Sequence, residues 1–384
     1  MHIHRFDGTL RTRPPEETWQ SVKPLLAGFG ITRVADVTGL DDLGIPVTMA
    51  VRPLSQTLSV AQGKGATLTA ARVSAAMEAI EVWHAERAVP PVIETHTAAK
   101  ELQLPYDVRT LDLHDGHLVT DAVRMDWVLA RCALTDDETL VPESVVRLGR
   151  AVHQDWRLHL PSASTNGLAS GNSRSEAIAH ALCEVIERDA LTHLDHTRPG
   201  EIIDPSSVTD AHCAALLAKL NGCWLELRHV GNEFRVPVMT CHLWREDQSA
   251  AIVSGSGAHP DPAVALSRAI TEAVQTRLTQ ITGSREDCLP LIYSQQPHAA
   301  PRTCEQAAVD WHLIARRYSR PASTDTDVAR ALARAVHQAS GHAPLIVDLT
   351  RGTHLQESFS VVKVIAPELH YGARHTVPRP LEAR

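Results

Sequence analysis

Three short segments of this 384-residue chain repeat one pattern, in which a glutamate is followed three residues later by glutamate or glutamine. The segments are AAMEAIE at residues 75–81, ALCEVIE at 181–187 and AITEAVQ at 269–275. Small and aliphatic residues separate the polar ones, so each segment predicts a largely apolar helix with its polar residues on one face. Buried carboxylates need compensation of their charge. We therefore interpret the three helices as three walls of one acidic site.

The central repeat lies in residues 164–194, where a glycine-rich polar loop leads into a helix. Ser173 and Glu176 have the spacing of a capping box, which predicts a helix beginning near Ser175. Glu184, Glu187 and Arg188 then follow at positions i, i+3 and i+4, on one face of that helix. Alone, these residues would fit a solvated ion pair on an amphipathic helix. Their recurrence elsewhere in the chain favours a shared site.

The three helices together supply five carboxylates that indicate a metal ion. They are Glu78, Glu81, Glu184, Glu187 and Glu272. Coordination by carboxylate oxygens without His or Cys suits Mg²⁺, which proteins usually hold together with the phosphates of a nucleotide.

A lysine between two glycines precedes the first of these helices, which we expect over residues 69–87. Lys64 lies between Gly63 and Gly65, in a sequence that lacks the spacing of a Walker A loop. A cation and flexible backbone ahead of a helix N-terminus form a plausible anion site. On the helix itself, Ser74 shares a face with Glu78 and Glu81, whereas Glu86 and Arg87 at its far end are expected to be solvated.

The composition is that of a soluble globular protein, with 43% hydrophobic and 21% charged residues. The net charge of −8 argues against a nucleic-acid-binding protein. The N-terminus lacks the apolar core of a signal peptide, and the chain has no apolar run long enough for a membrane span, so we expect a cytoplasmic protein without a membrane partner. The seven cysteines include no C-x-x-C pair, which argues against a disulfide framework or a zinc knuckle, and most are expected to be buried or free thiols. The oligomeric state stays open, with a homodimer as one candidate.

Helical and strand-like segments alternate in a way that predicts a mixed α/β (α+β) fold. We expect an N-terminal extension over residues 1–33, a catalytic domain over 34–370 and an extended, proline-containing tail over 371–384. Hairpins are expected at residues 125–146 and 223–244, a helix at 204–220, and a linker or crossing loop at about 295–305.

The motifs resemble those of the YcaO family. SVAQGKG precedes SAAMEAIE, STNGLASGN precedes HALCEVIERD, and GSGAHPDPAVALSRAITEAVQTRLTQITGSRED follows, in the order that the family shows. The resemblance covers about residues 34–367 and is closest to members that act with a TfuA-like partner. It implies a YcaO-type fold of mixed sheets and helices around a central site for ATP and Mg²⁺.

Family membership would imply that ATP phosphorylates the oxygen of a peptide backbone amide and that a nucleophile then attacks the amide carbon. External sulfide would form a thioamide, the outcome linked to TfuA-associated members. A substrate Cys, Ser or Thr side chain would form an azoline, and an amine an amidine. The tail retains only VPRP at residues 377–380, which favours the thioamide over the azoline. A ribosomally made precursor peptide would be the substrate, and a separate TfuA-like or leader-binding protein would be the partner.

The resemblance also implies roles for single residues. Glu78, Glu81, Glu184, Glu187 and Glu272 would bind Mg²⁺. Nucleotide contacts would come from Lys64, Ser74, Glu78, Asn172, Glu176, Glu184, Arg188, Gln275 and Arg277. The residues closest to the chemistry would be Glu187, Arg188 and Glu272. His180 replaces a serine common among relatives, and we expect it to be a packed helix residue without a ligand role.

An ATP-binding accessory protein without catalytic activity is the alternative from another functional class. The complete acidic set argues against it, because a simple nucleotide binder needs no five-carboxylate site.

Overall fold

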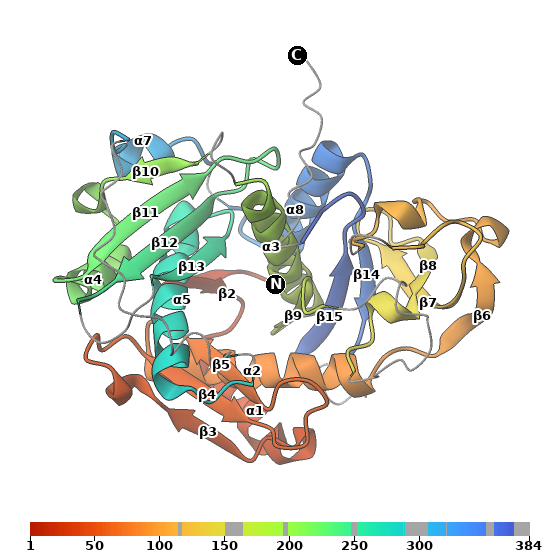
Figure 1. Ribbon diagram of the computed structural model, residues 1–384, viewed down its shortest axis with the longest axis horizontal. Coiled ribbons are helices and arrows are strands. Elements are labelled where there is room, and N and C mark those ends of the chain that lie inside the picture. Colours follow the sequence, from red (N-terminus) through yellow and green to blue (C-terminus); the bar gives the residue numbers. More distant parts are fainter. Residues whose placement is uncertain are drawn as a thin grey trace.

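The computed structural model describes residues 1–113, 117–149, 164–194, 199–246, 252–286, 288, 306–319, 321–350 and 357–371. Within them, helices and mostly antiparallel sheets are mixed, as the sequence predicts (Figure 1). The helices are α1 (Pro15–Val22), α2 (Leu68–Arg87), α3 (Arg174–Thr192), α4 (Ala211–Lys219), α5 (Pro262–Thr282), α7 (Trp311–Ala315) and α8 (Asp325–Ser340).

Four sheets are formed by the described strands. Strands β1 (His4–Phe6) and β2 (Thr9–Arg11) form a hairpin, and β3 (Arg33–Asp36), β4 (Val47–Val51) and β5 (Val60–Lys64) form a second sheet. The third has the order β10 (Glu201–Ile203), β11 (Trp224–Val230), β12 (Val238–Trp244), β13 (Val253–Ala258). The fourth has the order β6 (Val92–Ala98), β7 (Arg124–Cys132), β14 (Leu345–Asp348), β15 (Ser360–Ile365), β9 (Leu168–Gly171), with β8 (Glu138–Pro142) also paired to β7.

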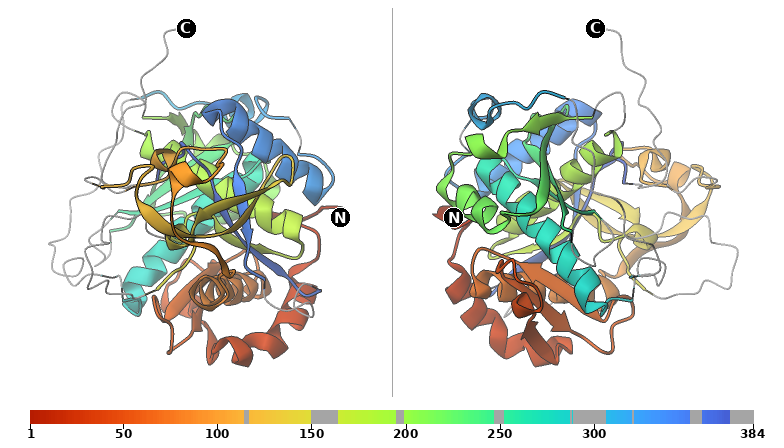
Figure 2. Two further views of the ribbon diagram at one scale, coloured as in Figure 1. Left: turned by 90° about the vertical axis from the view of Figure 1, so that its right-hand side faces the viewer. Right: turned by 60° about the vertical axis from the view of Figure 1, so that its left-hand side comes forward.

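Three strand–helix units, β5–α2, β9–α3 and β13–α5, form the centre of the molecule. Each helix packs on the strand that precedes it. Each helix also touches the strand of another unit: α2 contacts β9, α3 contacts β13, and α5 contacts β5. The contacts therefore close into a ring. In Figures 1 and 2 the three helices lie around the middle of the molecule, each beside the strand that precedes it.

Every helix of the ring has its own hydrophobic core. α2 packs with β7 and β8, α5 packs with β11 and β12, and α3 packs with α8 and β15. The apolar sides of the three helices thus face three different cores. Their polar faces are left to meet at the centre, which explains how helices so rich in Ala, Val and Ile can carry several glutamates.

Glycines on the ring strands allow the helices to approach closely. A Cβ atom on Gly63 would lie 2.0 Å from the backbone nitrogen of Ala75, and one on Gly255 would lie 2.2 Å from that of Ala273. A Cβ on Gly171 would lie 2.4 Å from the nitrogen of Ala177. Real Cβ contacts are longer than this, so each strand needs glycine where the helix crosses it.

Many of the predicted elements are confirmed. The β7–β8 and β11–β12 hairpins form as expected, and α3 begins one residue before the predicted start, with Ser173 accepting a hydrogen bond from the Glu176 nitrogen. The helix predicted at 204–220 is shorter, because Asp210 caps a new start and α4 covers only Ala211–Lys219. The predicted crossing loop and most of the predicted tail lie outside the described residues.

The first 33 residues, predicted only as an N-terminal extension, contain a hairpin and a helix. The β1–β2 hairpin was not predicted, and its turn residue Gly8, with a φ of 69°, sits against Ser267 of α5 and His212 of α4. The prediction that Glu86 is solvated is wrong. Its side chain is fully buried, and it accepts a 2.7 Å hydrogen bond from Arg52 and others from the loop that follows Arg52.

Replacing the glycine of a ring strand should destabilise the protein. Gly255→Ala places a Cβ against the backbone of α5, and we expect the free energy of unfolding to fall by about 1–3 kcal/mol. Gly231→Ala is the matched control, because nothing lies within 4 Å of its added Cβ. Urea unfolding of both variants measures the effect, and equal stabilities would contradict the role given to the crossing.

Candidate functional site

A cavity of about 800 Å³ lies where the polar faces of α2, α3 and α5 meet. All but one of the sequence-predicted site residues line it, although they come from segments more than 200 residues apart. These lining residues are Lys64, Ser74, Glu78, Glu81, Asn172, Glu176, Glu184, Glu187, Arg188, Glu272 and Gln275. The structure thus brings the three acidic helices together around one space.

A glutamate from each ring helix is hydrogen-bonded to the strand of another unit. Ser170 of β9 donates to Glu81 of α2 at 2.5 Å, and Ser256 of β13 donates to Glu187 of α3 at 2.6 Å. The third bond is ionic, because Lys64 of β5 donates to Glu272 of α5 at 2.6 Å. These three bonds follow the ring of helix–strand contacts and hold the carboxylates at fixed positions around the cavity.

The wall formed by α2 carries two carboxyl groups whose protonation is shifted. Burial raises the pKa of Glu78 to about 7, although Arg285 and Lys64 oppose the shift. Burial also raises the pKa of Glu81 to about 8, with the Ser170 hydrogen bond opposing it. Crowded carboxyls with raised pKa values bind a proton unless a cation replaces it, so this wall is suited to a divalent ion.

The wall formed by α3 combines two glutamates with an arginine. Arg188 donates to Glu184 at 3.0 Å, within the same helix. The second oxygen of Glu187 accepts from the backbone nitrogen of Ala258 at 2.8 Å. Burial raises the pKa of both glutamates, and the charge of Glu272 adds to the shift of Glu187.

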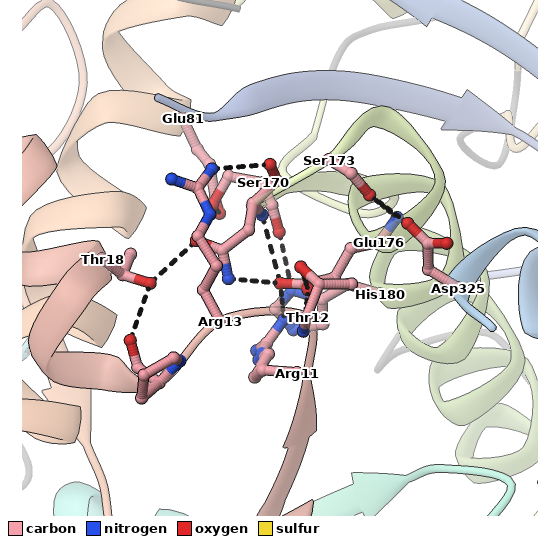
Figure 3. Close-up of polar contacts among 12 residues, drawn as sticks. Arg11, Thr12, Arg13, Thr18, Glu81, Ser170, Ser173, Glu176, His180 and Asp325 are labelled. Atoms are coloured by element: carbon pink, nitrogen blue, oxygen red, sulfur yellow. Dashed lines mark hydrogen bonds and ion pairs between the residues drawn. The ribbon is translucent and has the colours of Figure 1, made fainter. Parts of the chain in front are cut away.

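The start of α3 is joined to the N-terminal segment of the chain, as Figure 3 shows. Glu176 accepts hydrogen bonds from Arg11 at 3.2 Å and from the backbone nitrogen and hydroxyl of Thr12 at 2.8 and 2.7 Å. It also accepts from the backbone and side-chain nitrogens of Asn172, both at 3.1 Å. The Oδ1 of Asn172 accepts from Thr18 at 2.8 Å. Glu176 and Asn172 therefore tie the N-terminal segment to the cavity wall.

Arg277 is the one predicted site residue that does not line the cavity. Its guanidinium binds Asp41 through two nitrogens, at 2.7 and 3.3 Å, and both side chains are buried. The helical period explains this position, because a residue five positions after Glu272 lies about 140° away around the helix. Arg277 thus anchors α5 to the segment before β4.

Several basic residues at the cavity were not predicted from the sequence. Arg11, Arg13, Arg268 and Arg285 all line it. Arg268 could have been found, because it lies four residues before Glu272 and so on the same face of α5. Arg11 and Arg13 could not, because nothing local to the N-terminal segment shows that it returns to the site.

His180 also lines the cavity and is more than a packing residue. Its Nε2 accepts from Arg268 at 2.9 Å, and its Nδ1 lies 3.4 Å from the carbonyl oxygen of Ser170. Burial, with the charge of Arg268, holds the pKa of His180 well below its usual value. The imidazole is therefore neutral and helps to orient Arg268.

The groups around the cavity fit a nucleotide with Mg²⁺. Carboxylates suit the ion, and the basic residues suit phosphate. Two buried polar atoms of the lining, Nη1 of Arg188 and Oε1 of Gln275, have no hydrogen-bond partner among the described residues, and a ligand would supply one. No three acidic, His or Cys side chains in the described part of the chain are grouped closely enough to hold an ion alone. Phosphate and water would complete the coordination, as is usual for Mg²⁺.

Comparison with protein-family models identifies the family of the chain. Residues 62–370 match the family model described as YcaO cyclodehydratase, ATP- and Mg²⁺-binding. The chain belongs to the YcaO family. The resemblance seen in the sequence is thereby confirmed, and the family description agrees with the predicted cofactors, ATP and Mg²⁺.

Individual relatives span nearly the whole YcaO chain. An uncharacterized protein of Mycobacterium tuberculosis is 37% identical and covers 99% of this chain and 86% of its own length. A protein from the tfuA 3′ region of Rhizobium leguminosarum bv. trifolii is 34% identical and covers 94% of this chain and 88% of its own length.

Two solved structures share the fold. YcaO from Methanopyrus kandleri, bound with AMPPCP and Mg²⁺, has a TM-score of 0.70 and 24% identity, covering 96% of this chain and 95% of its own. A heterocyclase in complex with substrate and cofactor has a TM-score of 0.78 and 18% identity, and covers 94% of this chain. The match includes 53% of the heterocyclase chain, so the present protein spans about half of it. No described helix of the YcaO chain is both long and apolar enough to cross a membrane.

The raised pKa values of Glu78 and Glu81 predict a pH-dependent stability. Between the unfolded value near 4.5 and the folded values of about 7 and 8, the folded state holds protons that the unfolded chain has lost. The metal-free protein should therefore lose stability as the pH rises from about 5 to 8.5, and added Mg²⁺ should restore more of it at the higher pH.

Thermal unfolding at several pH values, first with a chelator and then with Mg²⁺, measures the slope of stability against pH. The double variant Glu78→Gln, Glu81→Gln should flatten it. Glu16→Gln, Glu17→Gln is the control, because both glutamates lie exposed at the start of α1. An unchanged slope in the α2 variant would show that other groups cause the pH dependence.

Proposed function

We propose that this protein uses ATP and Mg²⁺ to replace the oxygen of a peptide backbone amide, with sulfur as the incoming atom and a thioamide as the product. The observation that carries the proposal is the convergence of five glutamates from three helices on one cavity that also contains Lys64, Arg188 and Arg268. Alternating acidic and basic groups suit a magnesium-bound triphosphate beside a neutral amide.

The proposed reaction has two substitutions. The amide oxygen attacks the terminal phosphorus of ATP and ADP leaves, so that the oxygen becomes part of a phosphate ester. Hydrogen sulfide then adds to the amide carbon, and the carbon–oxygen bond breaks as phosphate departs. The products are the thioamide, ADP and phosphate. When bound, the nucleotide supplies the phosphoryl group that makes a poor leaving group a good one.

Each wall of the cavity has a proposed task. Glu78, Glu81, Glu184, Glu187 and Glu272 would hold Mg²⁺. Lys64 and Arg188 would bind phosphate oxygens, with Ser74 and Gln275 as further polar contacts. Glu176 would shape the nucleotide site by holding Arg11, and Asn172 would do so by holding Arg13 through its backbone carbonyl, since the side-chain oxygens of both residues already accept hydrogen bonds. Arg277 receives no task in the reaction, because it is paired with Asp41 outside the cavity lining.

Two observations support the thioamide product. The Rhizobium relative lies in a tfuA 3′ region, and the sequence motifs of the present chain resemble those of TfuA-associated members. A TfuA-like protein, or another protein that binds the leader of a precursor peptide, would be the partner. The reaction consumes ATP, which fits a cytoplasmic location.

An azoline-forming cyclodehydratase is the second candidate. It is favoured by the fold shared with the heterocyclase and by a TM-score of 0.64 to the E. coli microcin synthetase McbBCD complex. In this case a Cys, Ser or Thr side chain of the substrate would attack the activated amide in place of sulfide. The cavity chemistry up to the phosphate ester would be the same.

Peptide mass separates the candidate functions. The protein is incubated with ATP, Mg²⁺, sulfide, a TfuA-like partner and a candidate precursor peptide. Thioamide formation should raise the peptide mass by the difference between sulfur and oxygen, and ring closure should lower it by one water. ATP binding without ATP turnover and without any change of peptide mass would instead support a non-catalytic accessory protein.

Glu187→Gln should weaken magnesium-dependent nucleotide binding by about 10-fold or more while leaving the protein folded. The substitution removes one of several crowded charges, which relieves repulsion, and the amide oxygen can still accept a hydrogen bond from Ser256. Calorimetric titration with a non-hydrolysable ATP analogue measures the affinity, and circular dichroism measures the fold. An unfolded variant would show that Glu187 is structural and would remove it from the proposed metal site.

A further inference from the structure

Tyr371 stacks on the guanidinium of Arg188 at the edge of the cavity. The centre of its ring lies 4.4 Å from the Cζ atom of Arg188, well inside the range of a cation–π contact. Both residues line the cavity, and the tyrosine is 40% exposed. The contact joins a residue near the C-terminus to the most charged part of α3.

The backbone next to Tyr371 is held firmly against α3. The nitrogen of His370 donates to the buried Asp189 at 2.9 Å, and Thr192 donates to the carbonyl oxygen of His370 at 3.3 Å. The nitrogen of Tyr371 donates to Asp112 at 3.2 Å. The ring is thus placed by its anchored backbone, independently of Arg188.

Among the described residues, the surroundings of Arg188 leave one of its guanidinium nitrogens without a hydrogen-bond partner. Its Nη2 donates to Glu184 at 3.0 Å, and the ring of Tyr371 covers the guanidinium. Its Nη1 is buried and has no hydrogen-bond partner in the described part of the chain. A guanidinium fixed by an ion pair and by stacking loses little further freedom when it binds an anion.

We infer that Tyr371 is a positioning residue, which holds Arg188 so that its Nη1 is available to an anionic group of the ligand. This inference rests on the proposed function, in which that group is a phosphate. The tyrosine acts through Arg188 and needs no contact with the nucleotide. The aromatic face, and not the phenol hydroxyl, is the part that matters.

Calorimetric titration with AMPPCP and Mg²⁺ tests the inference on the full-length protein. Tyr371→Leu removes the aromatic face and should weaken binding by about 3- to 10-fold, the range expected for a partly desolvated cation–π contact. Tyr371→Phe keeps the face and should recover most of the affinity. In an Arg188→Gln background, Tyr371→Leu should cause no further loss, because the residue acts through the arginine.

Tyr318→Leu is the matched control. This tyrosine is half-buried and makes an edge-to-face contact with the ring of His229, but it does not line the cavity. Its substitution should leave nucleotide affinity unchanged. Three outcomes would each overturn the inference. The first is an equal loss of nucleotide affinity in Tyr371→Leu and Tyr318→Leu, and the second is an equal loss in Tyr371→Phe and Tyr371→Leu. The third is a full additional loss of affinity when Tyr371→Leu is made in the Arg188→Gln background.

Binding by the unsubstituted protein tests the proposed nucleotide site separately. The assay uses no peptide, so a failure to find thioamide activity would leave the comparison between variants intact.

Discussion

This structure depends on three close crossings. At each one, a strand with a glycine at the contact passes a helix that has small residues there. At each crossing the helix backbone occupies the space where a strand Cβ would lie. Only such short separations allow three helices to present their polar faces to one cavity while each packs its apolar side into a separate core. Larger residues at the crossings would push the helices outward and separate the glutamates that now face one another.

Bringing these carboxylates together creates an electrostatic problem that the cavity solves in two ways. Hydrogen bonds from Ser170 and Ser256, and the ammonium of Lys64, each stabilise one glutamate of the ring. The remaining charge is met by arginines from different parts of the chain and, in Glu78 and Glu81, by raised pKa values. The site is therefore suited to a cation, because a bound cation makes the electrostatic energy of the clustered carboxylates more favourable.

Much of this arrangement could be predicted from the sequence because the acidic pattern repeats at a helical spacing. The recurrence of a glutamate followed three residues later by glutamate or glutamine identified all three walls, and the resemblance to the YcaO family supplied the nucleotide. Glu86 was misread, because a buried glutamate and a solvated one look alike until the loop that donates to it is known. The roles of Arg11 and Tyr371 depend on contacts with distant segments, which no local pattern encodes.

The ring of bonds has a consequence for how the site comes into being. Glu81, Glu187 and Glu272 find their partners 89, 69 and 208 residues away in the chain, each in a different unit. No unit therefore supplies the hydrogen-bond partner of its own ring glutamate. Removing any single strand–helix unit would therefore leave one glutamate of the other two units without its partner and would remove one wall of the cavity.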